Sequence, residues 1–140
     1  MSLSTNRLWL VDTGASHNVD PHSSDLSEAE LCNEAFDVVG NKASAHAKSK
    51  GTLVLLLPIV GNGEKRRPTK LKPLRFPDSY YIPGNRENIL AYPQLRKAGL
   101  ELDLGSARLY SPSDPTVHVP VLFYHGRPFV KLRVTTEKSA

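Results

Sequence analysis

The sequence predicts an all-β protein with one short helix late in the chain. Eleven prolines are scattered from Pro21 to Pro128 among the 140 residues. Each proline removes a backbone donor and breaks a helix interior, which disfavours a helical bundle. Short apolar or alternating runs are separated by glycine, proline and asparagine, a pattern that is typical of strands joined by turns. The length suits a single domain with a hydrophobic core of its own.

The expected elements can be placed in order along the chain. The first strand is the apolar run 8–11, which we expect to be buried on both faces, whereas residues 1–7 should contribute little to the fold. Residues 27–33 are expected to hold a helical turn, and residues 35–50 a hairpin around a Gly-Asn turn signal. Further strands are expected at residues 51–59, 79–82, 88–90 and 100–104, and in a final hairpin with arms 117–124 and 129–134 and a turn at 125–128.

The one predicted α-helix begins near Pro93 and ends near Ala98. Proline suits the first helical turn because its missing N–H would have no helical acceptor there. Gly99 follows directly, and glycine is the residue that most often closes a helix at its C-terminal end. The sequence therefore predicts a helix of less than two full turns between two strands.

Charge and cysteine content indicate which partners and which cell compartment to expect. The formal net charge is +4, and residues 65–75 hold six basic residues and no acid. No aromatic residue interleaves with these cations, so we expect a solvated loop or hairpin tip, with phosphate binding as an open alternative. Cys32 is the single cysteine, which favours a reducing compartment. The longest apolar run, 52–60, is too short to cross a bilayer as a helix, so neither a secretory leader nor a membrane partner is expected.

The stretch 8–16, LWLVDTGAS, ends an apolar strand in a carboxylate. Charging an acid at the end of a buried strand costs free energy unless the acid is hydrogen-bonded or paired. Gly14 permits a sharp turn with close backbone approach, and the Thr13 hydroxyl can bond to a neighbouring backbone. Asp-Thr-Gly after an apolar run resembles the signature of aspartic proteases. Asp12 is therefore the candidate catalytic residue, and Thr13 and Gly14 are its candidate supports.

Later segments extend this resemblance to retropepsin-like aspartic proteases, most closely to those of copia-type retrotransposons. Residues 80–83, YYIP, are similar to a strand that ends in Val-Pro or Ile-Pro in those enzymes, and 88–90 to the segment that follows it. Leu95, Gly99 and the Ser-His pair at 16–17 also fit the copia-type pattern. The resemblance covers residues 8–104.

This resemblance implies an architecture and an assembly. The expected fold is a retropepsin-like acid-protease barrel that is an obligate homodimer. Residues 1–104 would form the protease core, and residues 105–140 a β-hairpin extension of the same domain. Few residues precede Asp12, whereas retroviral proteases use a longer lead as a strand of the dimer sheet. We therefore hypothesise that the 117–134 hairpin helps to build or to replace that interface.

One pair of residues departs from the retroviral pattern. Retroviral enzymes usually carry an acid after Asp-Thr-Gly-Ala and an arginine at the start of the late helix. This chain has Ser16 and Tyr92 at those places. Both members of the ion pair are absent together, so neither charge is left buried alone.

The resemblance implies peptide hydrolysis by two carboxylates around one water. Two like charges so close together cannot both ionise cheaply, so the pair shares a proton. Residues 103–107, DLGSA, are similar to the motif DTGAS at 12–16, but Leu104 has no hydroxyl to support a catalytic Asp103. A chain of 140 residues is also too short for two lobes of the usual domain size. The second carboxylate is therefore expected to be Asp12 of a second copy, brought close by a two-fold axis.

An extended peptide is the expected substrate, bound along strand edges. Ala15 and Ser16 are expected to line the site. The residues Gly40, Asn41 and Lys42 are expected to form the tip of a flap that covers the peptide and excludes water.

No cofactor is expected for this chemistry. The spacing of His17, His22 and Cys32 matches no strong zinc pattern, so no metal site is expected either. A nucleophilic Cys32 paired with His46 or His118 is an unsupported alternative.

The function expected from these observations is an aspartic endopeptidase that cuts a retroelement polyprotein inside the cell, within the cytoplasm or a retroelement particle. A second class is a catalytically silent, retroelement-derived module that keeps the dimeric fold for protein interaction. A third is nucleic-acid binding through residues 65–75, for which affinity would fall steeply with salt.

Overall fold

The computed structural model describes residues 2–36, 45–60 and 68–137, and it confirms an all-β chain with one short α-helix. The elements of this part of the chain are β1 (Ser2–Asp12), β2 (Val19–Asp20), the 3-10 turn η1 (Ser23–Asp25), β3 (Leu26–Phe36), β4 (Ala45–Val60), β5 (Pro68–Tyr81), β6 (Asn88–Ala91), α1 (Tyr92–Lys97), β7 (Glu101–Asp103), β8 (Arg108–Ser111), β9 (Asp114–Tyr124) and β10 (Arg127–Glu137).

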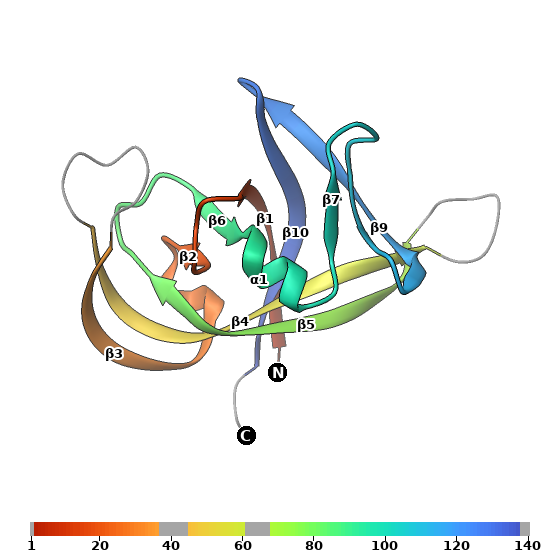
Figure 1. The fold of residues 1–140 in the computed structure, drawn as a ribbon. Coiled ribbons are helices and arrows are strands. Elements are labelled where there is room, and N and C mark those ends of the chain that lie inside the picture. The colour runs from red at the N-terminus through yellow and green to blue at the C-terminus, as the bar shows by residue number, and fades with distance from the viewer. Residues whose placement is uncertain (1, 37–44, 61–67, 138–140) are drawn as a thin grey trace.

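The strands form one highly curved sheet. Their order is β3-β4-β5-β2-β6-β1-β10-β9-β8-β7, and β4 also pairs with β9 and β10. These extra pairings join distant places in that order, so the sheet curls back on itself. Figure 1 shows β3, β4 and β5 sweeping beneath β6 and α1, while the β9–β10 hairpin rises past the end of β1.

Strand β1 lies inside this sheet, between β6 and β10. Its last four residues pair in parallel with β6, from Trp9↔Asn88 to Asp12↔Ala91. Its other edge pairs antiparallel with β10, from Ser2↔Glu137 to Leu10↔Phe129. Strand β1 is therefore paired on both sides at Trp9 and Leu10, and its last two residues are held by β6 alone.

The core is built from both halves of the chain. Trp9, Leu55 and Leu90 are fully buried in it, and so are Leu109 and Val130 from the C-terminal part. Burying side chains of this size is worth about 1.5–3 kcal/mol each. Residues 105–137 therefore supply core and sheet pairing to the same domain that holds Asp12.

Several sequence predictions for single elements are confirmed. Helix α1 ends where Gly99 adopts a φ of +89°, the left-handed conformation that glycine allows at a helix end. In the predicted 35–50 hairpin, Ala35 pairs with His46 and Phe36 with Ala45, although its tip lies outside the described residues. The paired strands are longer than predicted and continue back to Leu26↔Leu53. The final hairpin forms with a two-residue turn, His125-Gly126, in which both residues have positive φ. Its second arm therefore resumes at Arg127, two residues earlier than expected.

The predictions for the most polar segments were wrong. Residues 27–33 form part of strand β3 instead of a helical turn, with two irregularities and a positive φ of 54° at Glu28. From Pro68 onward the basic segment is strand β5 instead of a loop or hairpin tip, although Lys70, Lys72 and Arg75 are exposed as expected. In both cases the apolar strand β4 needs partners on its two edges, and pairing with it outweighs local composition.

The beginning of the chain also differs from expectation. Residues 2–7 extend β1 and pair with β10, so they are part of the sheet. Leu8 keeps 40% of its surface exposed, so the first strand is buried on both faces only from Trp9 onward.

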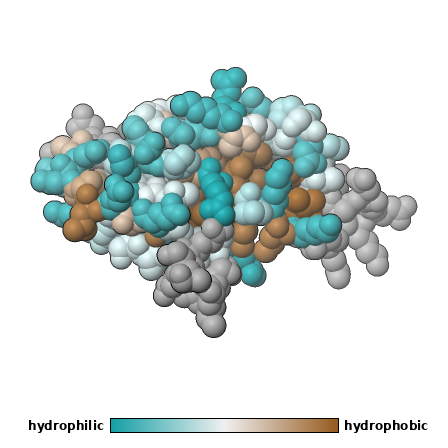
Figure 2. Space-filling model, turned by 90° about the horizontal axis from the view of Figure 1, so that it is seen from below, coloured by the Kyte–Doolittle hydropathy of each residue, from teal (hydrophilic) through white to brown (hydrophobic). Residues whose placement is uncertain are grey.

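Some hydrophobic surface remains outside the core. Figure 2 shows hydrophobic residues gathered in the middle and toward one end of the lower face, between hydrophilic areas. The large hydrophobic side chains that stay exposed in the described chain are Leu8, Leu31, Leu71, Leu104, Leu122, Phe123 and Tyr124. The last three are consecutive at the end of β9. In the described residues, no helix is long and apolar enough to cross a membrane.

Candidate active site

Asp12 is the last residue of β1, and its side chain is only partly exposed. It lies directly opposite Ala91 in the parallel β1–β6 ladder, and α1 begins at the next residue, Tyr92. The carboxylate is thus held where two parallel strands end and a helix starts. Such a place suits a reacting group, because the backbone that carries it is fixed by the sheet while the side chain reaches the surface.

The turn after Asp12 is closed by the carboxylate itself. The Gly14 N–H donates to Asp12 Oδ1 over 2.8 Å. Asp103 makes a similar bond, because the Gly105 N–H donates to Asp103 Oδ1 over 3.0 Å. The turns that begin at Asp12 and Asp103 therefore share the same hydrogen bond, as their similar sequences suggest. This bond alone does not identify a catalytic acid.

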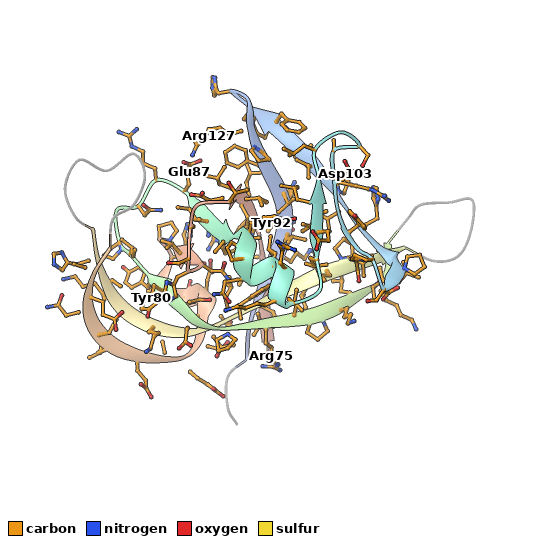
Figure 3. All side chains as sticks on the ribbon, viewed as in Figure 1. Arg75, Tyr80, Glu87, Tyr92, Asp103 and Arg127 are labelled. Atoms are coloured by element: carbon orange, nitrogen blue, oxygen red, sulfur yellow. The ribbon has the colours of Figure 1, made fainter. Side chains whose placement is uncertain are left out.

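Asp12 and Asp103 differ in their position in the sheet. Asp103 ends β7, and three strands stand between β7 and β1 in the sheet order. Figure 3 shows Asp103 at the upper end of β7, to the right of Tyr92. Further bonds from Ser106 lower the pKa of Asp103, as expected for a partly exposed carboxylate that caps a turn. Asp103 is therefore in no position to act as the second carboxylate for Asp12.

A buried asparagine fixes the loop that follows Asp12. Asn18 is 1% exposed, and its Oδ1 accepts a 2.7 Å hydrogen bond from the Ala91 N–H. The Asn18 carbonyl also accepts the Tyr80 N–H over 3.0 Å. One residue thus connects the loop to β6 and β5. The sequence analysis missed Asn18, which sits in a polar segment with no motif to single it out.

Helix α1 holds the same loop from the other side. Gln94 Nε2 donates to the Ser16 carbonyl over 3.0 Å. Tyr92 instead faces β7, where its hydroxyl donates to Glu101 Oε2 over 2.9 Å and accepts the Leu102 N–H over 3.1 Å. The loop and the helix are thus joined by a neutral hydrogen bond from Gln94. The sequence analysis did not single out Gln94.

The other predicted site residues are placed as follows. Thr13 is exposed, and Ala15 packs against the small cluster of Val19, Tyr80 and Ile89. The Ser16 hydroxyl lies 2.9 Å from His17 Nδ1. The predicted flap tip, Gly40, Asn41 and Lys42, lies outside the described residues.

The strands on either side of β1 are also tied together by charge. Arg127 Nη2, at the start of β10, donates to Glu87 Oε1 over 2.7 Å, just before β6. Figure 3 shows these two side chains pointing toward one another above β6, whereas Arg75 points away on the lower side of β5. The described part of the basic run therefore lies away from this end of β1.

His17, His22 and Cys32, the residues considered for zinc in the sequence analysis, make separate contacts in the structure. His17 packs edge-on against the Tyr80 ring, with 5.1 Å between ring centroids, and the Cys32 thiol donates to the Ala47 carbonyl over 3.7 Å. His22 belongs to a different group with Asp20 and Asp25, whose nearest polar atoms lie within 4.8 Å of one another. Arg7 donates to both oxygens of Asp25, over 3.0 and 3.1 Å, so Asp25 already has a cationic partner.

No family model, no curated protein and no solved structure matches this chain.

Proposed function

We propose that this protein is an aspartic endopeptidase of the retropepsin type, active as a homodimer. The observation that carries the proposal is the position of Asp12 at the end of β1, opposite Ala91 in the parallel β1–β6 ladder and beside the start of α1. The Asp-Thr-Gly sequence supplies the residue types, and this placement gives the acid a fixed backbone and a partly exposed side chain. Asp103 shares the local turn but lacks this setting.

The proposed reaction needs Asp12 from two copies of the chain. One carboxylate is ionised and takes a proton from a water molecule, whose oxygen attacks the peptide carbonyl carbon. The other carboxyl is protonated and donates its proton to the carbonyl oxygen. The carbon–nitrogen bond then breaks, and the leaving nitrogen receives a proton. Each carboxyl exchanges its role in the process, so the pair must hold one proton between them.

Features of the single chain are consistent with such an assembly. Asp12 and Thr13 both reach the surface, so a two-fold axis beside them can bring two copies of the motif together. The exposed end of β9, Leu122 to Tyr124, rises beyond the same end of β1 (Figure 1). This is the part of the final hairpin that is free to meet a partner, because β10 already pairs with β1 of its own chain. The role of this hairpin in the dimer stays a prediction.

The substrate class follows from the same proposal. An extended segment of a polyprotein, including the polyprotein that contains this chain, would lie between Asp12 and the β3–β4 hairpin. Ala15 and Ser16 would contact it from the loop, and Gly40 to Lys42 from the hairpin tip. Backbone bonds would hold the peptide and side-chain pockets would choose the cleavage site.

The experiment compares Asp12→Asn with Asp103→Asn in a polyprotein-fragment cleavage assay. Both substitutions remove a carboxylate that accepts a glycine N–H in a turn. We expect Asp12→Asn to lower the cleavage rate at least about 100-fold, the loss typical of a general acid or base, and Asp103→Asn to leave it unchanged. An inhibitor that mimics the tetrahedral intermediate should block the wild-type chain.

A mixing experiment tests the shared site. In an equal mixture of wild-type and Asp12→Asn chains that exchange freely, only about a quarter of dimers carry two aspartates, so activity should fall to about a quarter. A fall to one half would mean that each chain works alone. Absence of cleavage at every pH by a dimer confirmed by sedimentation would favour the catalytically silent interaction module.

A further inference from the structure

Four polar side chains meet where β1, β2 and η1 come together, away from the motif that the proposed function uses. Arg7 comes from β1, Asp20 from β2, His22 from the turn after β2, and Asp25 from η1. Asp20 is 1% exposed and Asp25 is 3% exposed. Two carboxyl groups this deeply buried require partners for all their oxygen atoms or a proton to remove a charge.

The partners of three of the four carboxyl oxygens are identified. Arg7 Nε donates to Asp25 Oδ2 over 3.0 Å, and Arg7 Nη2 donates to Asp25 Oδ1 over 3.1 Å. Asp20 Oδ1 accepts the His22 N–H over 2.8 Å and lies 2.9 Å from His22 Nδ1. Asp20 Oδ2 is buried and has no hydrogen-bond donor among the described residues.

The neighbouring Asp25 accounts for this orphan oxygen. One carboxyl oxygen of Asp20 and one of Asp25 lie within 4.8 Å of one another. Two ionised carboxylates cannot hydrogen-bond, because neither has a proton to donate. A proton on Asp20 would serve as the missing donor and would also remove one of the two buried negative charges. Burial and the neighbouring Asp25 raise the pKa of Asp20 to about 8, which agrees with this arrangement.

The other groups around the pair do not replace this proton. Burial and the Arg7 charge lower the pKa of His22, so its ring is neutral near pH 7. Tyr81 of β5 stands opposite Asp20 in the β2–β5 register and adds no charge. On β10, which packs against η1, Lys131 and Arg133 are exposed. Arg7 is thus the one cation recorded beside the two acids in the described chain.

We propose that Asp20 and Asp25 form a buried proton-binding pair that makes the junction of β1, β2 and η1 more stable in acid than in base. With the proton bound, Asp20 donates to Asp25, and Asp25 stays paired with Arg7 on the strand that ends in Asp12. Without the proton, two buried negative charges lie close together and share a single positive charge, the guanidinium of Arg7. The proposal concerns folding stability, so it holds or fails independently of any protease activity.

The sign of the effect follows from proton linkage. An unfolded aspartate releases its proton near pH 4, whereas folded Asp20 keeps it until about pH 8. Between these values the folded state binds one more proton than the unfolded state, so stability falls as pH rises. For one linked proton the unfolding equilibrium constant rises up to about tenfold per pH unit over this window. Above the window both states have released the proton and this contribution levels off.

The test substitutes Asp20→Asn, which imitates the protonated acid because the amide can donate to Asp25. Asp78→Asn is the matched control, an exposed aspartate at a positive φ of 60° that asparagine tolerates well. Urea unfolding of all three full-length chains between pH 5 and pH 9 should show stability falling with pH in the wild type and in Asp78→Asn. The Asp20→Asn chain should show a much flatter profile and be the most stable of the three at pH 9. Parallel profiles for wild type and Asp20→Asn would overturn the proposal.

A second measurement covers the case in which Asp20→Asn does not fold. The side-chain carboxyl carbon of Asp20 in the wild-type chain should titrate near pH 8 by nuclear magnetic resonance. Titration near pH 4 would refute the proton-binding pair. Addition of zinc gives the remaining control. A zinc-dependent gain in wild-type stability at pH 8 that Asp20→Asn abolishes would show that a metal ion, and not a proton, satisfies Asp20.

Discussion

Asn18 Oδ1 lies 2.7 Å from the backbone nitrogen of Ala91, the residue that faces Asp12 across the parallel β1–β6 ladder. The loop that follows the candidate catalytic acid therefore returns to satisfy the backbone of the strand beside that acid. Two segments that lie about seventy residues apart in sequence share one buried hydrogen bond. The position of Asp12 depends on this closure as well as on its own strand.

Replacing Asn18 by alanine should expose that dependence. The Ala91 N–H would stay buried without an acceptor, which costs about 1–3 kcal/mol of unfolding free energy. Urea unfolding monitored by Trp9 fluorescence gives the value. Asn6→Ala, at an exposed asparagine of β1, is the control and should change stability by less than about 0.5 kcal/mol. Equal losses for the two variants would mean that the Asn18 bond contributes nothing specific.

Replacing Gln94 by alanine should separate activity from stability. The bond to the Ser16 carbonyl is exposed, so its loss should cost no more than about 1 kcal/mol. The loop beside Asp12 would lose its tether to α1, and we expect the cleavage rate to fall further than the stability change explains. Lys97→Ala, on the same helix but exposed, is the control. If both variants cleave at the wild-type rate, the tether is not needed for the proposed activity.

Replacing Arg7 by methionine should destabilise the chain more at pH 9 than at pH 6. Methionine keeps much of the side-chain volume but leaves Asp25 without a cation, and breaking a buried pair in this way costs about 3 kcal/mol. At pH 6 the proton held by Asp20 removes one of the two negative charges, so the loss of Arg7 should cost less there than at pH 9, where Asp20 is ionised. Thermal unfolding at the two pH values measures the difference. A pH-independent loss would show that Arg7 acts through packing alone.

A chain that ends at residue 104 should not fold. It would lack β8, β9 and β10, and β1 would lose its antiparallel partner along with core side chains such as Leu109 and Val130. Circular dichroism and heating should show no cooperative transition, whereas the full chain unfolds in one. A shortened chain that folds, dimerises and cleaves would mean that residues 105–140 are dispensable to both core and interface.

The sequence predicted best where local physics decides the structure. The apolar strand that ends in Asp12, the helix between Pro93 and Gly99, and the final hairpin each carry their own signals in a few neighbouring residues. It failed at β3 and at the start of β5, because those strands are polar and exist through pairing with β4. Local composition cannot reveal a partner that lies elsewhere in the chain.

The supporting contacts of the candidate site were out of reach for the same reason. Gln94 meets the Ser16 carbonyl across 78 positions, and Arg7 meets Asp25 across 18. Glutamine and arginine are common on surfaces, and no spacing rule marks these two. Only the folded backbone brings them to the groups that they bind.

The sequence by itself determined that the chain is all-β and that one acid, Asp12, stands at the end of an apolar strand, because side-chain periodicity and turn residues act within a few positions. The tertiary structure decided where each of two similar turns lies in the fold. Asp12 and Asp103 each accept a glycine N–H, but only Asp12 lies against β6 and α1. It also decided that Asp20 and Asp25 are buried together. The free energy of ionising a carboxyl group depends on its burial and on its distance from charges on remote segments. Both are set only when the chain folds.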